Sequence, residues 1–163
     1  MNFTRGKVFS RNNNIEVLNY NLEDDYYSFI KKNSEKGYEQ VILTTDFMLA
    51  ILKYYFIDRK FTIKEIIPVD EEGFLVSKFE SYIERIEEDR DQFLKLLEEM
   101  DFLFYEKNAL DIFKMELSGK NKFDERIRLN VQINGIINIK ESCYEEEKEN
   151  IRNVILTHFG WKQ

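Results

Sequence analysis

The stretch that decides the fold is residues 127–140, IRLNVQINGIINIK, in which apolar and polar side chains alternate on both sides of a central Asn-Gly. A period of two predicts β-strands with one buried face, and Asn-Gly predicts a tight turn between them. A two-residue loop would place Val131 opposite Asn138 and bury polar groups. A three-residue loop that ends with Gly135 in the left-handed conformation pairs Val131 with Ile137 instead. We therefore predict a hairpin with a glycine bulge.

Elements of both kinds flank this hairpin. Alternation over 113–117 predicts a preceding strand, which ends at a turn expected over 118–121. After the hairpin, Ser142 and Glu145 form a capping box that predicts the start of a helix, and Gly160 predicts its end. The apolar face of that helix carries Ile151, Val154, Ile155 and His158.

The first third of the chain predicts a second hairpin and further helices. Runs of β-prone residues at 7–11 and 15–20 flank three asparagines that favour a turn. Asn21 is positioned to cap a helix that Gly37 ends. The elements expected next are a strand over 40–44, an apolar helix over 45–57 and a strand over 61–69, whose end Pro68 places at a sheet edge or a turn.

Residues 78–100 predict one long helix, because apolar residues recur seven apart on one side and acidic residues occupy much of the other. The apolar stripe is interrupted at Asp89 and Arg90. It either lies on the protein's own sheet or forms the contact of a homodimer. Residues 70–77 are compatible with a turn, a strand or a first helical turn, and 102–106 with an extra strand. The stripe consists of Phe79, Ile86, Phe93 and Met100.

These elements predict an α+β fold, since helices and hairpins are interspersed without regular βαβ alternation. We expect a mainly antiparallel sheet with hairpins at both ends of the chain, covered by about four helices that include the long acidic one. With one proline, six glycines and no low-complexity stretch, no linker is apparent, and residues 1–163 are expected to form a single domain.

Charge is the strongest functional signal. Residues 66–111 carry 5 basic and 14 acidic side chains, a net −9, whereas the whole chain carries −7. Such a surface attracts cationic partners, although acidic helix faces are also common as solvated surface. The expected function is a binding protein of the inhibitor or immunity type that neutralises a basic protein. The residues expected to contact that partner are Glu80, Glu84, Glu87, Glu88, Asp91, Glu98, Glu99 and Tyr82.

Catalysis is not expected. The chain has one cysteine, Cys143, and one histidine, His158, and the two lie toward opposite ends of one predicted helix. Zinc sites built from nitrogen and sulfur ligands need more of these residues. Asp46, Asp58 and Lys60 only loosely resemble a magnesium-dependent hydrolase set, because they do not fall on neighbouring strands. We therefore expect no catalytic residues, no metal and no cofactor.

Nucleic acid and membranes are not expected as partners either. A small basic and amide patch is predicted on one face of the C-terminal hairpin, but it lacks aromatic side chains for stacking. The first residues lack the apolar core of a signal peptide, so we expect a cytoplasmic protein. The alternative function is a structural or regulatory subunit of a complex, including a homodimer through the long helix. The patch consists of Arg126, Arg128, Asn130, Asn138 and Lys140.

Overall fold

The computed structural model describes residues 2–70 and 73–160, and it confirms the α+β class with an antiparallel sheet. The order of strands across the sheet is β2-β1-β7-β6-β5-β4, and the two-residue strand β3 also pairs with β1. The strands are β1 (Phe3–Arg11), β2 (Asn14–Asn19), β3 (Glu39–Gln40), β4 (Thr62–Pro68), β5 (Ile112–Lys120), β6 (Arg126–Gln132) and β7 (Ile136–Lys140). The helices are α1 (Tyr26–Glu35), α2 (Thr45–Lys53), α3 (Phe74–Glu88), α4 (Phe93–Asp101) and α5 (Tyr144–Phe159).

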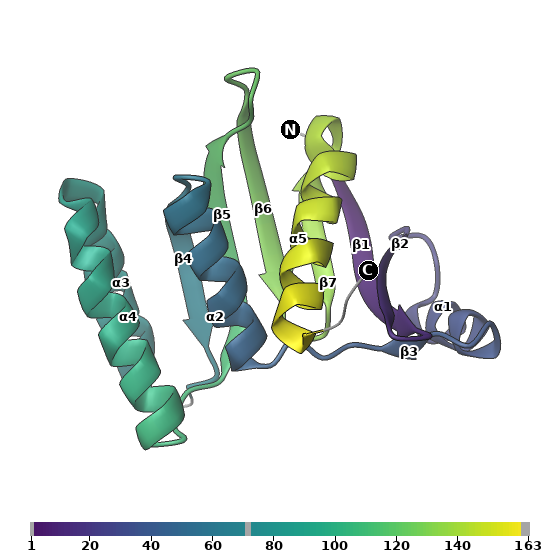
Figure 1. The fold of residues 1–163 in the computed structure, drawn as a ribbon, viewed down its shortest axis with the longest axis horizontal. Helices are drawn as coiled ribbons and strands as arrows, with labels where there is room; N and C mark the ends of the chain where they lie inside the picture. The colour runs from purple at the N-terminus through teal and green to yellow at the C-terminus, as the bar shows by residue number, and fades with distance from the viewer. Residues whose placement is uncertain (1, 71–72, 161–163) are drawn as a thin grey trace.

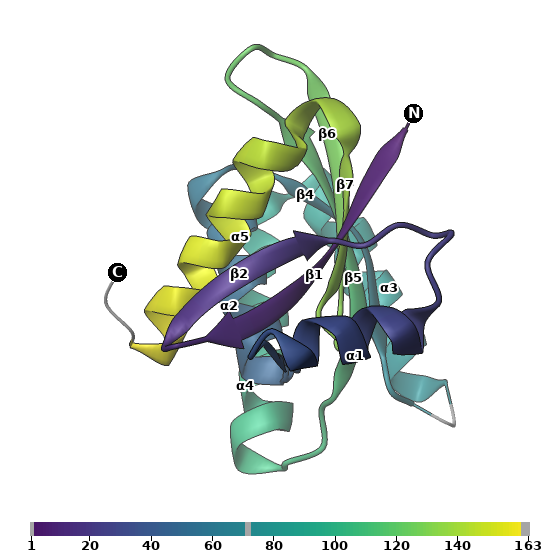
Figure 2. The ribbon, with the colours of Figure 1, turned by 90° about the vertical axis from the view of Figure 1, so that its right-hand side faces the viewer.

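The helices form layers on both faces of the sheet. Helices α2 and α5 lie side by side over one face, and α1 lies against the other face near β1 (Figures 1 and 2). Helices α3 and α4 stand at the β4 edge (Figure 1). The apolar helix predicted over 45–57 is confirmed as α2 and its continuation η1 (Tyr54–Asp58), a π-helical turn. Most of its side chains are buried in the hydrophobic core between the sheet and the helices.

The C-terminal hairpin has the predicted register. Val131 pairs with Ile137, and Leu129 pairs with Ile139. Gly135 has φ +81°, and a Cβ atom there would lie 2.7 Å from the carbonyl oxygen of Val41. Both the backbone angle and the close approach therefore require glycine. The polar patch predicted on this hairpin is also present, since Asn130 pairs with Asn138 on the face that lacks α2 and α5.

The turn between β5 and β6 lies later than predicted. The strand continues through Gly119, because the ring of Phe61 packs where a side chain would be: a Cβ at Gly119 would lie 2.2 Å from that ring. The turn is instead built by Asn121, whose Oδ1 accepts the backbone N–H groups of Phe123 and Glu125. Asparagine is well suited to this role, since its side chain mimics a backbone turn.

The N-terminal hairpin is confirmed, but the first helix starts later than predicted. Asn12 and Asn13 both have positive φ, at 53° and 58°, as a two-residue hairpin turn requires. Helix α1 is capped by Asp25, whose carboxylate accepts the N–H of Ser28, and not by Asn21. Of the strand predicted over 40–44, only Gln40 pairs with β1. The observed strand is therefore the two-residue β3.

The long helix predicted over 78–100 is broken at Asp89 into α3 and α4. Asp89 has extended backbone angles, and its carboxylate accepts the N–H of Asp91, which starts the 3-10 turn η2 (Arg90–Gln92). The chain then reverses, so that Lys78 of α3 forms an ion pair with Glu99 of α4. The apolar stripe faces the inside of this helical hairpin and the core. The exposed fractions of Phe79, Ile86, Phe93 and Met100 are 0%, 4%, 2% and 0%.

Because the stripe is buried within the chain, it does not provide the dimer contact considered above. The segment left open in the sequence is helical from Phe74 onward; part of it, 71–72, lies outside the described residues. The extra strand considered over 102–106 is instead η3 (Phe102–Glu106), a π-helical continuation of α4.

The α3–α4 hairpin is an insertion between two neighbouring strands. Pro68 at the end of β4 pairs with Ile112 at the start of β5, and the N–H of Val69 donates to the carbonyl of Asp111 at 2.8 Å. The two ends of the hairpin segment therefore meet, and β4 is an edge strand as Pro68 indicated.

Helix α5 begins without the predicted capping box. A short 3-10 turn, η4 (Glu141–Cys143), precedes it, and the Ser142 hydroxyl bonds the carboxylate of Glu125 at 3.2 Å instead of the helix N–H groups. Gly160 ends the helix with φ +74°, as predicted. The buried Cys143 and the partly exposed His158 lie at opposite ends of it.

Candidate functional site

The strongest candidate surface is a row of carboxylates along the exposed side of α3. Their spacing of three and four residues places them on one face of the helix. All are solvent-exposed, and none forms an ion pair with another residue that the structure describes. We call this row the α3 acidic face; it consists of Glu80, Glu84, Glu87 and Glu88.

The other residues predicted for this surface are placed differently. Asp91 is exposed in the connection between the two helices, and Glu98 is exposed on α4. Glu99 is half-buried and neutralised by Lys78. Tyr82 is half-buried against the core, and the guanidinium carbon of Arg85 lies 5.5 Å from the centre of its ring. The structure therefore brings together four of the eight residues and turns Glu99 and Tyr82 inward.

An apolar surface on α4 and η3 was not found in the sequence. Leu94, Phe102 and Tyr105 are 63%, 47% and 65% exposed. Their spacing of eight and three residues places them on one side of a helix, with the exposed Glu98 between them. Sequence reasoning missed this surface because 102–106 was considered as a strand. We call these three residues the α4 apolar face.

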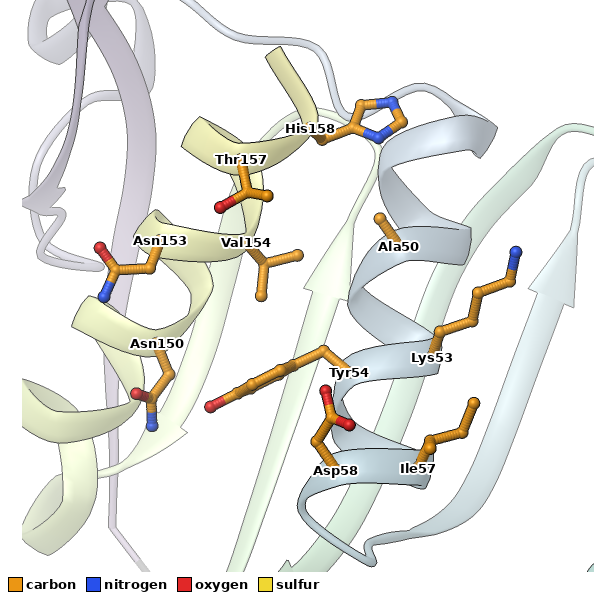
Figure 3. A pocket seen from close by; sticks show the side chains of 10 residues that line it. All are labelled: Ala50, Lys53, Tyr54, Ile57, Asp58, Asn150, Asn153, Val154, Thr157 and His158. Atoms are coloured by element: carbon orange, nitrogen blue, oxygen red, sulfur yellow. The ribbon is translucent and has the colours of Figure 1, made fainter. Parts of the chain in front are cut away.

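A groove of about 730 Å³ runs between α2 with η1 and α5 (Figure 3). Apolar side chains on its walls, such as Ala50 and Val154, are interspersed with polar ones. Figure 3 shows Tyr54 reaching toward α5, with Asp58 beside it. The groove is lined by Ala50, Lys53, Tyr54, Ile57, Asp58, Asn150, Asn153, Val154, Thr157 and His158.

One end of this groove is closed by His158 and Asp46. The imidazole Nε2 lies 2.7 Å from the Asp46 carboxylate, and the ring packs against Phe47 with centroids 4.6 Å apart. Although partial burial opposes it, hydrogen bonds from Thr44 and His158 lower the pKa of Asp46. The pair connects the end of α5 to the start of α2.

The loosely spaced hydrolase set is not assembled. Asp46 lies at the start of α2 and Asp58 at the end of η1, roughly 18 Å apart along a helix that rises about 1.5 Å per residue. Within the described ranges 2–70 and 73–160, no three His, Cys, Asp or Glu side chains are placed to hold one metal ion.

The glutamates at the start of α5 include a buried one that sequence reasoning missed. Glu147 is fully buried and accepts two hydrogen bonds from Arg59, at 2.7 and 2.9 Å, and one from the hydroxyl of Tyr55 at 2.9 Å. The hydrogen bond to Glu147 raises the pKa of Arg59, and burial raises the pKa of Tyr55. These contacts fix η1 against α5. Glu147 is one of three glutamates in the first turn of α5, where negative charge also suits the helix dipole, so the sequence alone does not distinguish it from Glu145 and Glu146.

No family identifies this chain. Comparisons with protein-family models, curated proteins and solved structures found no match. Over the described residues, no helix combines the length and apolar character that crossing a membrane requires.

Proposed function

We propose that the protein is a cytoplasmic, non-catalytic binding protein that neutralises a basic protein partner through the α3 acidic face. The observation that carries this proposal is the row of exposed carboxylates, none of which forms an ion pair with a residue of the described ranges 2–70 and 73–160. Glu80 and Glu84, and likewise Glu84 and Glu88, are four residues apart, a spacing at which like charges destabilise a helix by roughly 0.2–0.5 kcal/mol per pair. A partner that supplies lysines and arginines would relieve this repulsion.

The position of the row supports the same proposal. Helices α3 and α4 stand at the β4 edge, away from α1 at the other end of the molecule (Figure 1). The hairpin segment and its flanks carry the net −9, whereas the rest of the chain is close to neutral. The negative electrostatic field is therefore strongest at the α3–α4 hairpin. Such a field orients the protein as it approaches a basic surface.

The test compares three baits in pull-downs from the native host's lysate, at low and at high salt. The first is the wild type, and the second reverses the α3 acidic face to lysine. The third makes the same change in net charge elsewhere on the surface. We expect one basic protein to be captured by the first and third baits, released by salt, and absent from the second. The control substitutions are Asp24→Lys, Glu35→Lys, Glu39→Lys and Glu141→Lys.

Capture that is unchanged by reversal of the α3 acidic face would refute the proposed surface. The captured protein is then purified and its own activity measured as the wild-type binding protein is added. An inhibitor lowers that activity in proportion to occupancy. Binding without any loss of activity would refute neutralisation and leave only the binding surface.

A second candidate is supported by the α4 apolar face, whose three large side chains are exposed together. Exposed apolar patches of this kind mark contacts with other chains. On this alternative the protein is a structural or regulatory subunit, and a second copy of the chain is one partner to test. Sedimentation velocity over a wide concentration range decides the homodimer version, since a monomer at the highest concentration excludes it.

A further inference from the structure

A polar groove of about 840 Å³ lies on the sheet face opposite α2 and α5. Its floor is formed by side chains from β1, β7, β6 and β5, which are neighbours in the sheet (Figure 1). One wall is the segment Tyr20–Glu23, which leads from β2 to α1. The polar residues of its floor are Arg5, Lys114, Asn130, Gln132 and Asn138.

Arg5, Asn138 and Asn130 form a hydrogen-bond relay, in which each side chain donates to the next. Arg5 Nε donates to Asn138 Oδ1 at 3.0 Å, and Asn138 Nδ2 donates to Asn130 Oδ1 at 2.8 Å. An arginine has donors only, so each following amide must accept with its oxygen and donate with its nitrogen. The relay therefore ends on the NH₂ group of Asn130, which has no acceptor among the described residues.

Lys114 adds a cation to the same floor. It is half-buried and forms no ion pair within the described part of the chain. The nearest carboxylate on its own strand face, Glu116, is bound by Arg128 from the neighbouring strand. Gln132 pairs with Lys114 across β5 and β6, so both side chains lie on the same face of the sheet and both line the groove.

Arg5 is held in place before any ligand arrives. Its guanidinium carbon lies 5.9 Å from the centre of the Tyr20 ring, and Nε is engaged by Asn138. Both terminal nitrogens of the guanidinium are left without an acceptor among the described residues. A fixed fork of this kind binds oxyanions with little loss of side-chain freedom.

We propose that this groove binds a phosphate group. The groove is lined by four sets of donors: the free nitrogens of Arg5, the ammonium of Lys114 and the amides of Asn130 and Gln132. A phosphate has more terminal oxygens than a carboxylate and can engage more of these donors at once. The net negative charge of the chain does not prevent this, because it is concentrated in residues 66–111 and exposed charges are screened over about 8–10 Å. Glu23 is the carboxylate on the groove wall, and Glu116, which is opposite Asn130 in the next strand, is bound by Arg128.

The test follows the side-chain NH₂ signals of Asn130 and Gln132 by NMR during titration with inorganic pyrophosphate at constant ionic strength. We expect saturable shifts in the wild type. Lys114→Met should weaken binding roughly tenfold or more, since it removes one charge-assisted contact. Lys95→Met is the matched control, because it removes an exposed lysine from α4 and should leave binding unchanged.

Absence of saturation in the wild type, or equal binding by Lys114→Met, would overturn the proposal. An equal response to acetate would overturn the assignment to phosphate. A single-stranded oligonucleotide that competes with pyrophosphate at lower concentration would support the phosphate site and assign its source to a nucleic-acid backbone. Competition only by small phosphate esters would assign it to a metabolite. None of these outcomes depends on the α3 acidic face.

Discussion

Because one lysine is buried, we expect the free energy of unfolding of this protein to change with pH in the alkaline range. The side chain of Lys7 is fully buried, and its ammonium donates to the carbonyl of Asn134 and lies 5.8 and 5.7 Å from the ring centres of Phe9 and Tyr26. Burial lowers its pKa from 10.5 to about 8. Each tenfold change in proton affinity corresponds to 1.36 kcal/mol, so keeping this lysine charged in the folded state costs about 3 kcal/mol.

The sign follows from proton linkage. Between about pH 8 and about pH 10.5 the unfolded chain binds a proton that the folded chain has released, so stability rises with pH across that window. Replacing Lys7 by methionine removes this contribution and keeps a side chain of similar length. We therefore expect the stability of the wild type, relative to Lys7→Met, to rise by about 3 kcal/mol between about pH 7 and about pH 11.

Urea denaturation followed by circular dichroism at several pH values measures this difference. Taking the difference removes the pH dependence that the two proteins share. Lys31→Met, at an exposed position of α1, serves as the control and should give a difference independent of pH. A wild-type curve that stays parallel to that of Lys7→Met over the whole range would show that the lysine has an ordinary pKa and would refute the reasoning.

Three further predictions concern stability, and urea denaturation tests the first two. Glu147→Gln should destabilise the fold by about 3–5 kcal/mol, because it leaves the charge of Arg59 without its partner. Gly119→Ala should lose about 1–3 kcal/mol to overpacking against Phe61, and Phe61→Leu in the same chain should recover part of it; no recovery would mean that the ring is not the obstacle. Asp25→Ala removes the cap of α1 and should cost about 1 kcal/mol, seen as faster hydrogen exchange in that helix alone.

The parts of the fold that could be predicted are those where burial and backbone geometry agree. The register of the C-terminal hairpin follows from alternation, since a shift by one residue would bury Asn138 against apolar residues. The asparagine turn at Asn12 and Asn13 follows from the rarity of positive φ in other residues. Both features follow mainly from residues that are close together in the chain.

The parts that could not be predicted depend on contacts between distant residues. Gly119 reads as a turn residue until Phe61, far away in the chain, is placed against it. The break at Asp89 lies within a regular apolar stripe, and only the packing of α4 back onto α3 shows that the stripe serves two helices. For the candidate site, spacing correctly placed Glu80 and its neighbours on one face. It could not show that Glu99 is engaged by Lys78.

Because α3 and α4 are inserted between β4 and β5, the acidic part of this protein is one continuous segment that could be moved to another protein. We call this segment the acidic cassette. Its ends meet at the Val69 to Asp111 hydrogen bond, so another antiparallel strand pair could accept the same segment without a change in strand order. The cassette would take the net −9 with it and leave a host that is almost electrically neutral. If the α3 acidic face binds the partner as proposed, replacing this one segment would alter the choice of partner while the strand order and the polar groove stay unchanged.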